Sequence, residues 1–122
     1  MIDNYFFDTY AIIEILKGNP AYEKYKNKKI MVTIFNLVEL HYKLLIDFNE
    51  RLAKEILEKY SKFVVDVNLE IIEETNKLKL FYKKQRLSIP DVMGYITAKK
   101  LGIKFLTGDK EFADMENVEF VK

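Results

Sequence analysis

The sequence predicts an α/β fold in which a mainly parallel sheet of four to five strands carries helices on both faces. Short apolar runs alternate with amphipathic segments along the chain. Several runs are too apolar for strands that expose one face to water, which favours a buried parallel sheet. Strands separated by helices require right-handed crossovers, and such crossovers place helices on both faces. The chain has 122 residues, so we expect residues 1–122 to form a single domain.

The first two strands are expected within the first 34 residues. Residues 5–7 are apolar, and the helical spacing that follows them stops at Gly18 and Pro20. A short helix over residues 21–25 then leads to a run rich in β-branched side chains at residues 30–34. This run predicts a buried parallel strand.

A helical hairpin is expected in the middle of the chain. Residues 35–48 have helical spacing, and Asn49 separates them from a second amphipathic helix that reaches Tyr60. The apolar stripe of the first helix is predicted at Leu37, Val38, Leu40, Leu44 and Leu45.

The pattern after the hairpin predicts another strand, a long helix and an edge strand. We expect a third strand at residues 63–67, a helix over residues 69–84 and an edge strand at residues 118–121. The buried side of the long helix is predicted at Ile71, Ile72, Leu78, Phe81 and Tyr82.

Between these elements, residues 89–112 predict a helix followed by a strand. Pro90 and Asp91 suit the first turn of a helix, and Gly102 suits its C-terminal end. The apolar run at residues 103–106 then forms a strand, and Asp109 follows it. In open α/β sheets, ligands bind where the strands end.

Four carboxylates should therefore meet at one edge of the sheet. Asp8 leaves the first strand and Asp109 leaves the fourth, while Asp91 opens a helix at the same edge. Glu39 lies just over one turn into the helix that follows the second strand. Clustered carboxylates repel one another, so they are tolerated mainly when divalent cations sit among them. Oxygen ligands favour Mg²⁺ or Mn²⁺.

Each acid also has a purely structural interpretation. Asp8 and Asp109 can be helix N-caps, and Asp91 can belong to a capping box opened by Ser88. Glu39 can belong to a polar stripe with Asn36 and Lys43, although it sits between two apolar neighbours. Convergence favours a site, because four independent caps need not fall at one sheet edge.

The ordered set of these residues resembles the PIN domain family over essentially the whole chain. The resemblance rests on Asp8 after an apolar strand, Glu39 in TIFNLVEL, Asp91 opening a helix, and the segment TGDKEF around Asp109. It places the acidic quartet of the family on those four acids. Thr9 and Thr107 fall at its hydroxyl positions. This sequence departs from the usual pattern at Val92, Met93 and Glu111.

The resemblance implies a single PIN-like domain with metal-dependent ribonuclease activity, of the size of the VapC-like toxins of toxin–antitoxin pairs. It further implies a small antitoxin partner and a homodimer. The alternative is a non-catalytic PIN-like module that binds RNA or protein. The residues themselves offer no other catalytic group: cysteine is absent, Ser61 and Ser88 lack a nearby base, and His41, the single histidine, is better explained by packing or surface exposure.

Charge and composition limit the remaining classes. Twenty basic against 19 acidic side chains leave a net charge of +1, so attraction to RNA must come from local clusters. Two basic clusters can either hold phosphates or form a solvated face. They are Lys24, Lys26, Lys28 and Lys29, and Lys77, Lys79, Lys83, Lys84 and Arg86. No signal segment and no apolar run near ~18 residues is present, so we expect a cytoplasmic protein.

Overall fold

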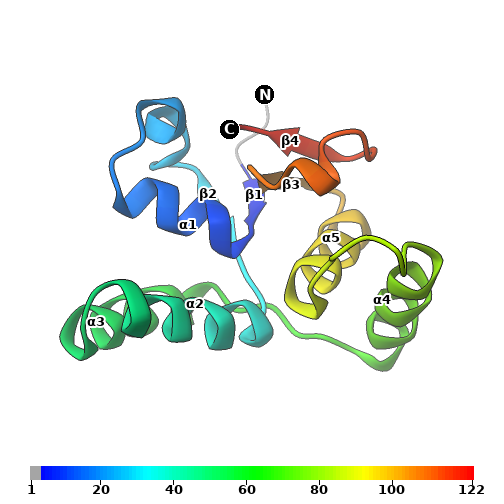
Figure 1. Cartoon of the computed structure of the whole chain (residues 1–122), viewed down its shortest axis with the longest axis horizontal. Helices are drawn as coiled ribbons and strands as arrows, with labels where there is room; N and C mark the ends of the chain where they lie inside the picture. The colour runs from blue at the N-terminus through cyan, green and yellow to red at the C-terminus, as the bar shows by residue number, and fades with distance from the viewer. Residues whose placement is uncertain (1–3) are drawn as a thin grey trace.

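The chain folds around a four-stranded sheet in which every pair of neighbouring strands is parallel (Figure 1). The computed structural model describes residues 4–122. The strand order is β2-β1-β3-β4, so β1 and β3 lie in the centre and β2 and β4 at the edges. The strands are β1 (Asn4–Phe7), β2 (Lys29–Met31), β3 (Lys104–Thr107) and β4 (Val118–Phe120). The predicted parallel sheet is confirmed, with four strands.

Five α-helices connect and cover the strands, and side chains cap each of them at its N-terminus. The helices are α1 (Thr9–Leu16), α2 (Ile34–Asp47), α3 (Glu50–Tyr60), α4 (Leu69–Phe81) and α5 (Ile89–Leu101). Short 3-10 turns are η1 (Pro20–Tyr25), η2 (Ser61–Phe63) and η3 (Lys110–Phe112). Gly102 ends α5 with a φ of 71°, the left-handed conformation that glycine adopts most easily.

The sheet separates two hydrophobic clusters, as the alternation of side chains along a strand requires. Phe7 packs with residues of α1, α2 and α3, whereas its neighbour Phe6 packs with residues of α4 and α5. Gly94 lets α5 approach the sheet closely, because a Cβ atom there would overlap the Phe6 ring. The prediction of helices on both faces is therefore confirmed.

Two strand predictions need correction. Residues 63–67 do not form a strand, since the segment makes one isolated parallel bridge, between Val64 and Val32. The strand predicted at residues 30–34 is an edge strand that ends at Met31, and Ile34 already begins α2 with half of its surface exposed. Thr33 stops the strand because its side chain accepts a hydrogen bond from the Asn36 backbone and caps α2.

Several apolar helix residues face water instead of the core. Val38 and Leu45 on α2 are exposed, and so are Ile72 and Phe81 on α4. The stripe that α2 does bury consists of Leu37, Leu40 and Leu44. The amphipathic pattern identified the helices correctly but assigned these four side chains to the wrong side. No helix within residues 4–122 is long and apolar enough to cross a membrane.

Candidate active site

Asp8 lies at the centre of the carboxyl edge of the sheet, where β1 passes into α1. It is 1% exposed and caps α1, because one carboxylate oxygen accepts a hydrogen bond of 2.8 Å from the Ala11 backbone. The other oxygen accepts a hydrogen bond from the Thr107 hydroxyl. The parallel pairing of β1 with β3 brings these two residues together. Asp8 is thus both a cap and part of a contact between strands.

Asp109 leaves the neighbouring strand, β3, at the same edge. Its backbone N–H donates a 3.0 Å hydrogen bond to the Thr107 hydroxyl oxygen, so Thr107 touches both Asp8 and Asp109. The Asp109 carboxylate accepts a 3.0 Å hydrogen bond from the Glu111 backbone and caps η3. Gly108 allows this tight exit, because a Cβ atom there would overlap the Tyr10 ring.

Asp91 and Glu39 approach the edge from two helices that are held together near their N-terminal ends. Asp91 lies in the first turn of α5, where its backbone N–H donates a 3.2 Å hydrogen bond to Ser88. The Asn36 side-chain nitrogen of α2 lies 3.5 Å from the Pro90 carbonyl oxygen of α5. Glu39, one turn after Asn36, is half-buried, and its Oε1 atom is buried without a hydrogen-bond partner.

The four acids interact electrostatically. Burial raises the pKa of the Asp8 carboxyl well above its usual range, and the charges of Asp91 and Asp109 raise it further. Burial also raises the pKa of Asp91 to about 7, with a further contribution from the charge of Glu39 and a smaller one from Asp109. The carboxyls are therefore near enough to influence one another's ionisation, and three of them also act as caps or first-turn residues.

The donor set suits a hard divalent cation. All four groups offer carboxylate oxygens, and the unpartnered Oε1 atom of Glu39 lacks the hydrogen bond that a buried acceptor normally has. Among residues 4–122, no three acidic or histidine side chains are close enough together to hold a metal by themselves. Mg²⁺ commonly keeps several waters and binds through one or two carboxylates, so it does not require such a closed group.

The remaining candidate residues occupy supporting positions. Thr9 is buried beside Asp8, and its hydroxyl oxygen has no hydrogen-bond partner. Glu111 is half-buried and meets Asp109 through its backbone. The departures at Val92 and Met93 are core residues, both buried in the cluster that packs around Phe6. They belong to the packing of α5 and leave Asp91 at its helix end.

Other possible catalytic groups have structural explanations. The Ser61 hydroxyl donates a 2.7 Å hydrogen bond to the Glu58 carbonyl, and Ser88 caps α5. His41 is half-buried on α2.

Asn36 and Lys43 of α2 have roles that the sequence did not predict. Asn36 is fully buried, forms a capping box with Thr33 and contacts the first turn of α5. The spacing of Thr33 and Asn36 could have revealed the box, although a capping box normally ends in Glu or Gln. Lys43 lies near enough to Asp91 that its positive charge partly offsets the rise in the pKa of that carboxyl. Its position four residues after Glu39 was the available signal.

Comparison with known proteins supports this reading of the fold. The PIN domain family matches the chain over residues 5–118. A comparison with curated protein sequences finds no match. A toxin–antitoxin complex from Klebsiella pneumoniae is similar in structure, with 21% identity, a TM-score of 0.72, and coverage of 94% of this chain and 95% of that one.

Two further solved structures share the fold. VapC20 from Mycobacterium tuberculosis, described as a sarcin–ricin loop cleaving toxin, has 17% identity, a TM-score of 0.78, and coverage of 97% of this chain and 99% of that one. VapBC2 from Rickettsia felis, solved with a DNA fragment from its promoter, has 17% identity, a TM-score of 0.70, and coverage of 98% and 99%.

Proposed function

The chain belongs to the PIN domain family, and on that premise we propose that it is a metal-dependent endoribonuclease that hydrolyses RNA phosphodiester bonds. The observation that carries the proposal is the buried Asp8 carboxyl, whose pKa is raised by burial and by the neighbouring charges of Asp91 and Asp109. A bound cation would stabilise the charged forms of such neighbouring carboxylates, and Thr107 joins Asp8 to the Asp109 backbone at this edge.

Asp8, Glu39, Asp91 and Asp109 would hold Mg²⁺ or Mn²⁺ at the carboxyl edge of the sheet. An ion held by these residues would activate a water for in-line attack and would stabilise charge on the leaving oxygen. Thr107 positions Asp8 and the backbone of Asp109 through its hydroxyl. Thr9, buried beside Asp8, and Glu111, half-buried beside Asp109, are supporting residues. No histidine base is needed in this mechanism.

A cleavage assay tests the activity directly. A single-stranded RNA oligonucleotide should be cut in the presence of Mg²⁺ or Mn²⁺ and remain intact with EDTA. Preparations of the wild type and of an Asp91→Asn variant, purified in parallel, control for a contaminating nuclease. Equal cleavage by the two preparations would contradict the proposed site.

We also propose that the enzyme is the toxin of a cytoplasmic toxin–antitoxin pair. Among the similar structures, the one from Klebsiella pneumoniae is a toxin–antitoxin complex and VapC20 is described as a toxin. A small antitoxin would insert a basic side chain among the four acids, and arginine suits this role because its planar group meets carboxylates bidentately. Saturation with a copurified antitoxin should abolish RNA cleavage. Unchanged cleavage at saturation would exclude this mode of inhibition.

A homodimer through helices of the middle region is a further part of the proposal. Val38, Tyr42 and Ile46 occupy successive turns of α2, and each exposes more than 60% of its surface. Exposed apolar rows of this kind are characteristic of interaction surfaces. Sedimentation at micromolar concentration should give twice the 14.5 kDa chain mass. A monomer would contradict this assignment, and Val38→Lys should weaken the dimer without lowering monomer stability.

The alternative function is a non-catalytic module that binds RNA or protein. One observation favours it: within the described residues, no three candidate ligands are grouped closely around one point. Calorimetric titration with Mn²⁺ distinguishes the two functions. The nuclease should bind the ion with an affinity that falls when Asp91 is replaced by asparagine, whereas the module should bind it weakly and without dependence on Asp91.

A further inference from the structure

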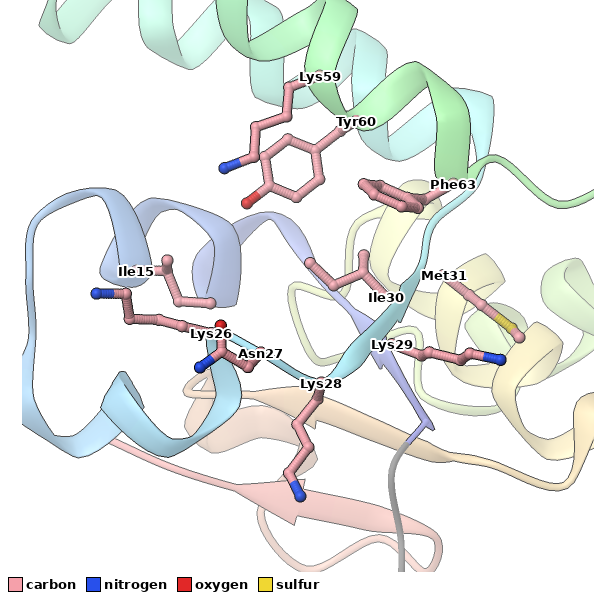
Figure 2. A pocket seen from close by; sticks show the side chains of 10 residues that line it. All are labelled: Ile15, Lys26, Asn27, Lys28, Lys29, Ile30, Met31, Lys59, Tyr60 and Phe63. Atoms are coloured by element: carbon pink, nitrogen blue, oxygen red, sulfur yellow. The ribbon is translucent and has the colours of Figure 1, made fainter.

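A hollow of about 570 Å³ opens beside the free side of the edge strand β2 (Figure 2). Its walls come from β2, from the end of α1, and from the C-terminal part of α3 with the turn after it. The apolar part consists of Ile15, Ile30, Met31, Tyr60 and Phe63. We call this hollow, together with its rim, the lysine pocket.

Four of its ten lining residues are lysines, and none is acidic. Lys26 and Lys59 flank the hollow from opposite sides, while Lys28 and Lys29 extend outward from the rim where β2 begins (Figure 2). The ion pair of Lys26 with Glu23 is exposed, so it competes only weakly with another anion. Lys59 lies 5.4 Å from the centre of the Tyr60 ring. In a chain with a net charge of +1, this is a local concentration of positive charge.

The pocket joins lysines that are distant in sequence. Lys59 comes from α3, 31 residues after Lys28. In the second basic segment, Lys79 of α4 donates a hydrogen bond of 2.9 Å to the Leu87 carbonyl. The first segment has the stronger case for binding an anion, because it lines this hollow together with Lys59.

The edge of β2 is too short to receive a peptide strand. Val32 already pairs with the segment at Val64, since its N–H donates to the Phe63 carbonyl and its carbonyl accepts from the Val65 N–H. Because the backbone groups of successive residues alternate in direction along a strand, Ile30 is the one residue of β2 whose N–H and C=O point away from β1, as those of Val32 do. Typical strands have about five to six residues. Charge complementarity with a flexible polyanion is thus the stronger explanation.

We infer that the lysine pocket binds the sugar-phosphate backbone of single-stranded RNA. The inference rests on the proposed nuclease function and extends it, because it names residues that hold the substrate away from the acids. Lys26, Lys28 and Lys29 lie at or just before the start of β2, which is the opposite end of the sheet from the carboxylates. Phosphates held there add affinity without touching the reacting bond.

Binding of a uridine oligonucleotide in metal-free buffer with EDTA tests the inference, because cleavage cannot then occur. The variant is Lys26→Gln with Lys59→Gln, and the matched control is Lys83→Gln with Lys84→Gln at the end of α4. Loss of two phosphate contacts should make the plot of the logarithm of the RNA association constant against the logarithm of salt concentration less steep by about 1.4. This change corresponds to roughly 25-fold weaker binding at 0.1 M salt. The control should bind like the wild type. Circular dichroism melts check that both variants are folded.

Equal binding by the wild type and both variants, or equal losses in the variant and the control, would overturn the inference. Unchanged RNA binding with weakened binding of a protein partner would also overturn it and would assign the pocket to that protein. Cleavage assays separate this result from the nuclease proposal. If the wild type cleaves RNA and the pocket variant has the same KM, the pocket fails and the nuclease stands. If the wild type does not cleave RNA but RNA binding still depends on both lysines, the nuclease proposal fails and the RNA-binding pocket stands.

Discussion

The carboxyl edge of the sheet and the lysine pocket differ in charge, burial and backbone support. At the carboxyl edge, Asp8 is buried and accepts two hydrogen bonds, and its pKa is raised by burial and by its negative neighbours. In the lysine pocket, Lys26 and Lys59 are exposed and contribute positive charge from mobile side chains. The first region is rigid and repels phosphate, whereas the second is adaptable and attracts it.

The difference shows how a nearly neutral protein can act on a polyanion. A set of carboxylates that holds a metal cannot also attract the substrate before the metal is bound. A separate basic surface overcomes this difficulty, because it supplies affinity without neutralising the acids. The two regions should therefore respond to different variables: the carboxyl edge to metal and pH, and the lysine pocket to salt.

Removing one acid should produce the largest effect. Asp8→Asn, Asp91→Asn and Asp109→Asn should each lower metal-dependent RNA cleavage at least about 100-fold, the scale on which loss of one preorganised electrostatic group acts. Asparagine caps helices about as well as aspartate, so the fold should persist. Metal-free melting temperatures should stay equal or rise, because repulsion is relieved. Asp114→Asn, an exposed acid in the nearby loop, is the control and should remain active. Full activity in all three variants would exclude the catalytic assignment.

The second effect is on the pH dependence of stability. Burial and the charge of Glu39 raise the pKa of Asp91 to about 7 in the folded protein, from the value of 3.8 that is usual for an exposed aspartate. The folded state therefore binds more protons than the unfolded state between these values, and the free energy of unfolding should fall as the pH rises from about 4 to 7. Added Mn²⁺ should offset this loss of stability, most strongly near pH 7 and above, where the carboxylates that would bind it are ionised. Melting curves at several pH values, with and without Mn²⁺, check this. A rise in metal-free stability over that range would contradict it, and Asp91→Asn should flatten the curve.

Thr107→Val should have an intermediate effect, a loss of stability and of RNA cleavage. It should leave the lysine pocket unaffected. The substitution removes a donor to Asp8 and an acceptor for the Asp109 backbone, and leaving buried polar groups unpaired costs about 1–3 kcal/mol. Cleavage should also fall, because Asp8 loses its orientation. Thr75→Val is a matched control: Thr75 is equally buried but its hydroxyl has no hydrogen-bond partner, so stability should hold or improve. Chemical denaturation of both variants measures the difference.

The smallest expected effect comes from a cap outside both regions. Asn49 caps α3 through a 2.8 Å hydrogen bond from the Leu52 backbone, so Asn49→Ala should cost about 1 kcal/mol of stability. Cleavage and RNA affinity per folded molecule should not change. A loss of either one at temperatures where the variant is folded would show that the hairpin of α2 and α3 communicates with a site.

Much of the carboxyl edge could be predicted from sequence because its geometry follows from topology. Parallel strands end at one edge, so the acids after residues 5–7 and 103–106 had to meet there. Ser88, Pro90 and Gly102 marked the limits of α5 with equal clarity. Each of these three residues favours one particular backbone conformation at a helix end, so its effect can be predicted from its immediate neighbours in the sequence.

The errors arose where the burial of an apolar residue depends on a distant partner. The run at residues 63–67 has strand composition, yet the chain leaves it for α4 after one bridge. Val38 continues the hydrophobic pattern of α2 but faces water, because the pattern alone does not distinguish a core from an interaction surface. The lysine pocket could not be predicted, since Lys59 joins it only through the tertiary fold.

The contact between Thr107 and Asp8 joins residues 99 positions apart. During synthesis on the ribosome, Asp8 leaves the exit tunnel long before β3 exists, and the strand that pairs with β1 on this side is missing until most of the chain has been made. Residues so distant in sequence also meet slowly, because a large loop must close first. An incomplete chain therefore carries only part of the acidic set. Under the toxin function proposed above, this order of assembly would keep each nascent chain inactive until β3 has been made.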